Sequence, residues 1–284
     1  MKRNLKITAF LLFCTLSLHA QVDTKGTDFW LTFAQNTMYT SASVSLQIRI
    51  VGSDQPATGT IYFTNINASV TFTVAAGGVF THNLTSTQIT AVYNTTAGTN
   101  NRSAHITSSS PVTAYAINQA AMSADATNIL PITALGTDYY QISYMPRNTG
   151  NNEVDAYAVV ATANNTVINH NGSPVATINT GQVYYFRTAA LSIDMTGARI
   201  TSDKPVAFFV VNQAAFVPDG YTGGDILFQQ LAPVNTWGKN FFVPVSHLGK
   251  DRIRNDGLTC HSEQREESAA IVNRCLATLD MTFA

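Results

Sequence analysis

The sequence has no cysteine between residues 21 and 259, although the whole chain is 284 residues long. Its three cysteines, Cys14, Cys260 and Cys275, stand outside that region. A disulfide framework therefore does not hold the central region together, and the fold must rest on hydrophobic burial. The chain is long enough to bury one large core or two ordinary ones.

Charge is also scarce, because charged residues make up 12% of the chain and the formal net charge is -1. A nucleic-acid partner requires a basic surface that neutralises phosphates, so this balance argues against one. Thr, Asn, Ser, Ala and Val dominate instead. That mixture is typical of extracellular β-sheet with short polar turns.

Catalytic motifs are missing as well. No Gly-x-Ser-x-Gly elbow occurs, the central region offers no cysteine nucleophile, and no histidine pair has the spacing of a zinc enzyme. The histidines of that region stand alone at His82, His105, His170 and His247. We therefore predict that the protein is not an enzyme, has no catalytic residues and uses no cofactor.

One loop offers weak candidates for a metal site. Between Pro218 and Asp225, the carboxylates of Asp219 and Asp225 could bind calcium together with backbone carbonyls. The loop lacks the regularly spaced Asp and Asn ligands of a dedicated calcium loop, so a plain glycine-rich loop is the favoured interpretation and no metal is predicted.

The first twenty residues have the pattern of a secretory signal peptide. Lys2, Arg3 and Lys6 precede an apolar run from Ile7 to Leu18, and Ala20 offers a small residue at the cleavage position. The run is shorter than the about 20 residues that a spanning helix needs, so no transmembrane segment is predicted. We expect residues 1–20 to be removed and the protein to be secreted or held at the cell surface.

The chain contains an internal repeat. The segment from Ala104 to Ala121 matches the segment from Ala198 to Ala215 at an offset of 94 without a gap, and Asn128 to Leu130 matches Asp225 to Leu227. Gly, then Thr or Lys, then Asp or Asn, then two aromatic residues open a unit at Gly26, Gly136 and Gly238. The predicted division is 1–20 signal peptide, 21–135 first repeat, 136–237 second repeat, 238–250 start of an incomplete third repeat, and 251–284 an unrelated tail.

Strand patterns fill both complete units. The segment from Val44 to Val51 alternates apolar and polar residues, and the segment from Pro205 to Val211 is apolar throughout, which predicts a strand buried on both faces. No amphipathic helix of ordinary length is visible between residues 21 and 250. The predicted fold class is all-β, with tandem units that resemble β-sandwich domains in size.

Residues 251–284 differ in composition from the rest. Ten of these 34 residues are charged, whereas 20 of the 230 residues from 21 to 250 are charged. Such a shift marks a boundary. We expect the tail to be disordered or to be foreign coding sequence, and the chain to be truncated within its third repeat.

Equivalent repeat positions predict structural roles. Asp28, Asp138 and Asn240 correspond, and the change to Asn favours a hydrogen-bonding turn role over a charged one. The amides of Asn118-Gln119 and Asn212-Gln213 end the central strand of each unit and should tie strand ends to the backbone. The aromatic residues of the openings are predicted to pack in the core, although a sugar-stacking platform is an alternative: Phe29, Trp30, Tyr139, Tyr140, Phe241 and Phe242.

Five dispersed stretches resemble the IgG Fc-binding protein N-terminal domain family, in its bacterial cell-surface type. They are Gly26 to Phe33, Ser110 to Tyr115, Leu135 to Tyr140, Ser202 to Val206 with Asn212-Gln213, and Leu231 to Phe241. The resemblance implies a part of a large surface protein and no catalytic residues. Family members often carry a cysteine where this chain has Ala214-Ala215, so any disulfide formed there elsewhere is absent. The segment from Arg254 to Ser268 looks like a translated intergenic repeat.

We therefore expect a non-enzymatic binding or adhesion module whose partner is an extracellular protein or glycan. The polar loops from Asn94 to Asn101 and from Pro146 to Glu153 are the predicted contact regions. A carbohydrate-binding accessory module and a structural spacer of a larger adhesin are the alternatives.

Overall fold

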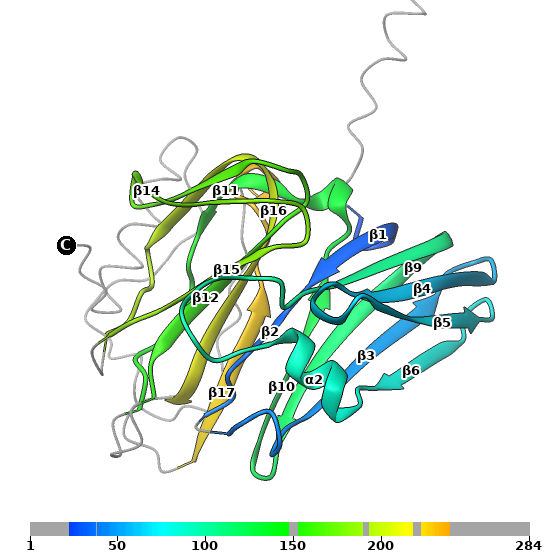
Figure 1. The fold of residues 1–284 in the computed structure, drawn as a ribbon, viewed down its shortest axis with the longest axis horizontal. Helices are drawn as coiled ribbons and strands as arrows, with labels where there is room; N and C mark the ends of the chain where they lie inside the picture. Colours follow the sequence, from blue (N-terminus) through cyan, green and yellow to red (C-terminus); the bar gives the residue numbers. More distant parts are fainter. Residues whose placement is uncertain (1–22, 38, 148–152, 190–192, 218–222, 239–284) are drawn as a thin grey trace, which may run out of the picture.

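The computed structural model describes residues 23–37, 39–147, 153–189, 193–217 and 223–238 (Figure 1). The predicted signal peptide, the segment 239–250 and the tail 251–284 lie outside the described residues. Within the described part of the chain, no helix combines the length and the apolar character needed to cross a membrane.

The first sheet is formed around the 17-residue strand β9. Its strand order is β5-β4-β9-β3-β6, and β1 and β10 also pair with β9. Side chains of β3 alternate between buried and more exposed, which confirms the period of two predicted for this segment. The strands are β1 (Gly26–Leu31), β3 (Ser45–Gly52), β4 (Ala57–Phe63), β5 (Ala68–Val74), β6 (Val79–Asn83), β9 (Ala104–Ala120) and β10 (Ser123–Ile129).

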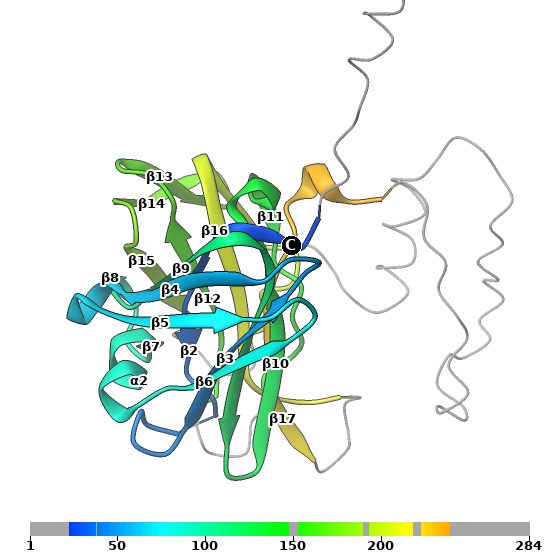
Figure 2. The ribbon, with the colours of Figure 1, turned by 90° about the vertical axis from the view of Figure 1, so that its right-hand side faces the viewer.

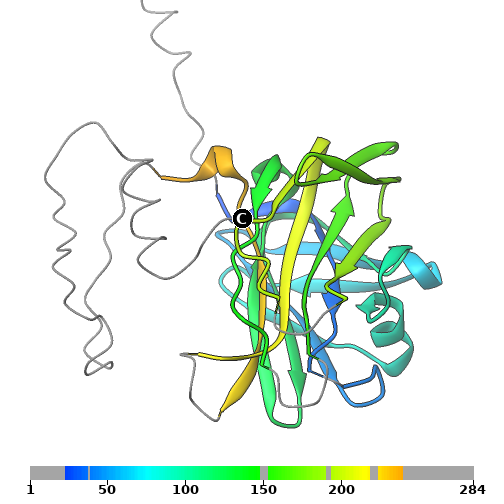
Figure 3. The same ribbon diagram turned by 90° about the vertical axis from the view of Figure 1, so that its left-hand side faces the viewer.

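The second sheet is formed around the 18-residue strand β16, seen crossing the sheet in Figure 3. Its order is β14-β13-β16-β12-β15-β8, and β11 and β17 also pair with β16. Strand β8 comes from before β9 in the sequence, so it links the first segment to the second sheet. The strands are β8 (Gly98–Asn100), β11 (Gly136–Tyr140), β12 (Asp155–Ala161), β13 (Thr166–His170), β14 (Ser173–Ile178), β15 (Val183–Arg187), β16 (Arg199–Phe216) and β17 (Gly224–Gln230).

Short elements complete the fold. Strands β2 (Phe33–Ala34) and β7 (Tyr93–Asn94) form a small parallel pair, and α2 (Ser86–Val92) lies beside β7 (Figure 2). A capping box between Thr85 and Gln88 begins this seven-residue helix. The 3-10 turns are η1 (Thr64–Ile66), η2 (Ile132–Ala134) and η3 (Val234–Thr236). The all-β prediction is confirmed.

The two sheets share one hydrophobic core. Phe33 of β2 stacks on Phe228 of β17 with ring centroids 5.7 Å apart. Phe228 in turn stacks on Phe209 of β16, with ring centroids 6.0 Å apart. Phe29 and Ile106 from the first sheet are fully buried in the same cluster. Residues 26–129 thus supply the first sheet, and residues 136–230 supply the second sheet apart from β8. The shared core lies between the two sheets (Figure 1).

Strand β16 is buried on both faces, as its apolar sequence predicted. Ala207, Phe209 and Val211 belong to the shared core. Val206 and Phe208 belong to a second cluster, on the side of the second sheet that faces away from the first.

The pairing of β1 with β9 follows the same pattern as the pairing of β11 with β16. Phe29 lies opposite Ile106, Tyr139 lies opposite Ile200, and both ladders shift register between the opening glycine and the following aspartate. The glycine is needed because a Cβ on Gly136 would lie 2.5 Å from the Cβ of Pro233. A Cβ on Gly26 would meet Pro131 at 2.3 Å.

Strands β10 and β17 close one edge of the sandwich through side-chain bonds. The Ser123 hydroxyl donates to the Asp225 carboxylate at 2.6 Å, and the Gln230 N–H donates to the Thr127 hydroxyl at 2.8 Å.

The β9–β10 and β16–β17 ladders correct the expected match of Asn128 with Asp225. Asn128 pairs with Tyr115, and Gln230 pairs with Phe209, the residue 94 positions after Tyr115, so the counterpart of Asn128 is Gln230.

Candidate functional site

Only one of the two weak metal candidates lies among the described residues. Asp219 lies outside the described residues. Asp225 accepts hydrogen bonds from the Ser123 hydroxyl and from the backbone N–H groups of Ala124 and Ile226, all on Oδ1. Among the described residues, no three His, Cys, Asp or Glu side chains gather closely enough to bind a metal ion.

The aspartates of the repeat openings lie in strands and not in turns, which corrects the turn role predicted for them. Asp28 contacts the His105 Nε2 at 2.8 Å, and Asp138 binds Arg199 through two contacts of 2.7 and 2.9 Å. Arg199 holds the pKa of the Asp138 carboxyl below its usual value. The match at offset 94 aligns His105 with Arg199 as equivalent positions. It does not show that each of them contacts the aspartate of the neighbouring strand. Asn240 lies outside the described residues.

Three of the four amide side chains at the strand ends form hydrogen bonds with backbone atoms, as predicted. The Asn118 amide donates to the Ala34 carbonyl at 2.9 Å, and the Asn212 amide donates to the Tyr144 carbonyl at 2.5 Å. Gln213 accepts from the Val154 N–H at 3.1 Å. Gln119 is exposed instead.

The aromatic residues of the openings divide into two groups. Phe29 and Tyr139 are fully buried, and Trp30 stacks on the His105 ring at 4.0 Å with 7% of its surface exposed, which confirms core packing for these three. Tyr140 is half-buried and lies 6.1 Å from the ring of Trp237. Phe241 and Phe242 lie outside the described residues.

The predicted contact loop from Asn94 to Asn101 is partly structural. The Asn94 amide is buried and donates to the Thr32 hydroxyl at 2.7 Å and to the Phe33 carbonyl at 2.9 Å. Part of the loop forms β8, while Thr96 and Thr99 remain exposed. In the other predicted loop, residues 148–152 lie outside the described residues.

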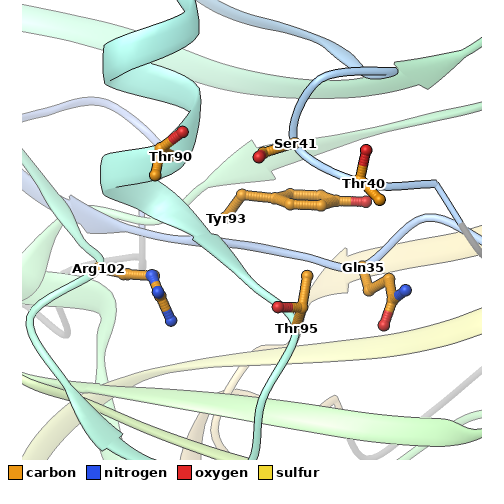
Figure 4. Close-up of a pocket in the computed structure, with 7 residues that line it drawn as sticks. All are labelled: Gln35, Thr40, Ser41, Thr90, Tyr93, Thr95 and Arg102. Atoms are coloured by element: carbon orange, nitrogen blue, oxygen red, sulfur yellow. The ribbon is translucent and has the colours of Figure 1, made fainter.

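A polar pocket opens beside the Asn94 to Asn101 loop, where segments from distant parts of the sequence meet (Figure 4). Its volume is about 210 Å³. The lining comes from the segment after β2, the end of α2, β7 with the loop that follows it, and the segment between β8 and β9. The lining residues are Gln35, Thr40, Ser41, Thr90, Tyr93, Thr95 and Arg102.

Tyr93 is a fixed part of the pocket. Its hydroxyl accepts from the Asn36 N–H at 2.7 Å and donates to the Tyr39 carbonyl at 3.1 Å. Burial raises the pKa of Tyr93, although the Asn36 N–H opposes this, so the phenol stays neutral. Figure 4 shows its ring between Thr40 and Ser41 on one side and Gln35, Thr95 and Arg102 on the other.

The remaining polar groups of the pocket are largely unengaged by the described residues. The Arg102 guanidinium has no hydrogen-bond or ion-pair partner among them, and the same holds for the Thr40 and Ser41 hydroxyls. Within the described part of the chain, no carboxylate lines the pocket. Sequence reasoning found only the neighbouring loop, because scattered neutral residues such as Gln35 form no motif.

A buried acid fixes the segments on the outer side of the second sheet. Asp155 is fully buried and accepts from the Gln141 amide at 3.0 Å, the Ser143 hydroxyl at 2.8 Å and the Met195 N–H at 2.9 Å. Burial raises the pKa of Asp155 to about 7, although the hydrogen bonds from Met195 and Ser143 oppose the rise.

Comparison with known proteins gives a family match over most of the chain. A family model described as "IgGFc binding protein" matches residues 15–193 and 190–259. The human protein "IgGFc-binding protein" is 27% identical over 146 residues, which is 47% of this chain and 3% of that protein. The chain therefore spans a small part of this relative's length. No solved structure matches.

Proposed function

The chain belongs to the IgGFc-binding protein family, and from this premise we propose that it is a non-enzymatic binding and adhesion module, exported or displayed at the cell surface. Its partner is an extracellular protein. The contact surface is the loop region around the polar pocket, bounded by Gln35, Thr40, Thr95 and Thr99.

One observation carries this proposal: the second sheet holds these loops, which come from the first half of the sequence, in place. The Thr37 N–H donates to the Gln213 carbonyl at 2.9 Å, and β8 pairs with β15. Arg187 reaches the Thr95 carbonyl at 3.4 Å. A surface that is ordered before binding loses less conformational entropy when a partner docks, so it is suited to recognition.

We also propose that the two sheets derive from tandem repeats, 21–135 and 136–237. The ungapped match at offset 94 and the common register of the β1–β9 and β11–β16 ladders support this. The proposed export signal at 1–20, the third repeat opening at 238–250, the unrelated tail at 251–284 and the bacterial origin rest on sequence alone.

Binding of the purified chain to immobilised proteins tests the proposal. The first ligands are the immunoglobulin Fc fragment, suggested by the family name, and a panel of secreted glycoproteins, with surface plasmon resonance as readout. Thr40→Trp places a bulky neutral side chain on the exposed pocket rim and should weaken binding at least tenfold. Thr81→Trp, on an exposed position of β6, is the matched control.

Two results contradict the proposal. One is a chain that binds no protein of the panel. The other is equal weakening by Thr40→Trp and Thr81→Trp, which would place the contact surface elsewhere.

A carbohydrate-binding accessory module is a second candidate, supported by one exposed aromatic pair. Trp237 is 42% exposed beside Tyr140, and the Arg199 guanidinium lies 5.8 Å from the centre of the Tyr140 ring. The burial of Phe29, Trp30 and Tyr139 removes three of the six rings considered for a sugar platform. Glycan-array binding that Trp237→Ala abolishes would favour this function. An array and a protein panel that both lack hits would favour a structural spacer.

A further inference from the structure

We propose that the pocket lined by Arg102 and Tyr93 binds a carboxylated sugar at the end of a glycan carried by the protein partner. This inference rests on the proposed function, because it names the group that the loop surface recognises on that partner. It concerns a different site from the Tyr140–Trp237 pair.

The charge of the pocket selects an anion. Arg102 brings a guanidinium that the described residues leave unpaired, and Arg187 lies next to the rim through its contact with Thr95. The described residues that line the pocket include no carboxylate that would repel an acidic ligand. A guanidinium pairs with a carboxylate through two parallel N–H···O bonds, which gives both strength and orientation.

The other lining groups suit the hydroxyl and amide groups of a sugar. Hydroxyl groups both donate and accept, and Thr40, Ser41, Thr90 and Thr95 each present one. The Thr90 hydroxyl donates to the Ser86 carbonyl at 3.0 Å and so offers its lone pairs. The Gln35 carbonyl oxygen accepts from the Gln213 amide at 3.0 Å, which leaves the Gln35 NH₂ group for a ligand.

The size of the pocket favours a sugar over a lone carboxylate. A volume of about 210 Å³ has room for several water molecules. This is more than a single carboxylate fills and is suited to one sugar ring with its substituents. The neutral Tyr93 ring, held by Asn36 and Tyr39, provides a fixed wall against which such a ring can lie.

Titration of the full chain with methyl α-sialoside, a carboxylated sugar, tests the inference by saturation-transfer NMR and calorimetry. Binding is expected at millimolar concentration or below, with no comparable binding of neutral methyl β-galactoside. Arg102→Gln keeps hydrogen-bond donors but removes the charge, and it should weaken sialoside binding about tenfold or more. Arg49→Gln, at an exposed position of β3, is the matched control and should leave binding unchanged.

Thr40→Val should weaken binding severalfold, because it removes a hydroxyl that makes no bond to the described residues. Absence of saturation transfer at millimolar sialoside would overturn the inference, as would equal binding of the galactoside. If acetate or a short acidic peptide competed equally well with the sialoside, the pocket would bind carboxylates in general, and the assignment to a sugar would be overturned.

The two proposals fail separately. Binding to a protein of the panel without any sialoside binding would refute the pocket assignment and leave the proposed function intact. Sialoside binding without any protein partner would refute the proposed function and leave the pocket assignment intact.

Discussion

The buried carboxyl of Asp155 makes the stability of the fold depend on pH. Its pKa rises from 3.8 to about 7, mainly through burial, so the folded protein binds this proton more tightly than the unfolded chain does. The contribution of Asp155 to the free energy of unfolding is therefore largest below about pH 4. It decreases as the pH rises and is lost above about pH 7.

The size of this effect follows from the pKa difference. Each pH unit corresponds to about 1.4 kcal/mol, so the upper limit of the loss between pH 4 and pH 7 is about 4 kcal/mol. For a fold of this size, such a loss lowers the melting temperature by on the order of 10 °C. Asp155→Asn removes the titration. It also turns an NH₂ group toward the Met195 N–H, which costs a constant amount at every pH.

Urea unfolding, followed by tryptophan fluorescence from pH 4.5 to 8.5, measures this difference. The wild type should be more stable than Asp155→Asn at pH 5, and its advantage should shrink by a few kcal/mol by pH 8. An advantage that stays constant, or that grows with pH, would refute a raised pKa for this carboxyl.

Two further predictions concern packing. Phe228→Ala should lower the free energy of unfolding by about 3–5 kcal/mol, and one calorimetric transition should shift as a whole because Phe228 packs in the core shared by both sheets. Two separate transitions would contradict the shared core. The control Val217→Ala, at a position 56% exposed, should change the free energy of unfolding by less than about 0.5 kcal/mol. Gly136→Ala should cost about 1–3 kcal/mol in denaturant titrations, because the new Cβ would lie 2.5 Å from Pro233. The control Gly223→Ala meets no atom within 4 Å, and an equal loss there would refute the role assigned to the close contact at Pro233.

Local patterns predicted the elements of the fold but not how they associate. The apolar run of β16 predicted burial on both faces, and the end positions of Asn118 and Asn212 predicted their bonds to the backbone. Alternation along a strand shows which side chains share a face, but not which sheet that face meets. The shared core therefore became visible only when Phe33 and Phe228 were seen in contact.

The pocket was beyond the reach of sequence reasoning for a different reason. Gln35 and Thr40 come from one loop, whereas Thr90 and Arg102 lie at least 50 residues later in the chain. Neutral polar residues at such separations carry no spacing signal. The contact of Asp28 with His105 was missed because the repeat comparison aligned equivalent positions and not cross-strand neighbours.

The two sheets meet through opposite faces, so the two halves of the sandwich are not interchangeable. The first sheet buries Val112, Ala114 and Ala116 in the shared core, but the residues 94 positions later, Val206, Phe208 and Val210, belong to the second cluster. The second sheet instead gives Ala207, Phe209 and Val211 to the shared core, and their counterparts Thr113, Tyr115 and Ile117 are only half-buried on the outside of the first sheet. Equivalent strand positions therefore face the shared core in one sheet and face away from it in the other. If the second unit stood in the first position, its Phe209 and Val211 would face water, so the order of the two units is fixed by which face each sheet buries.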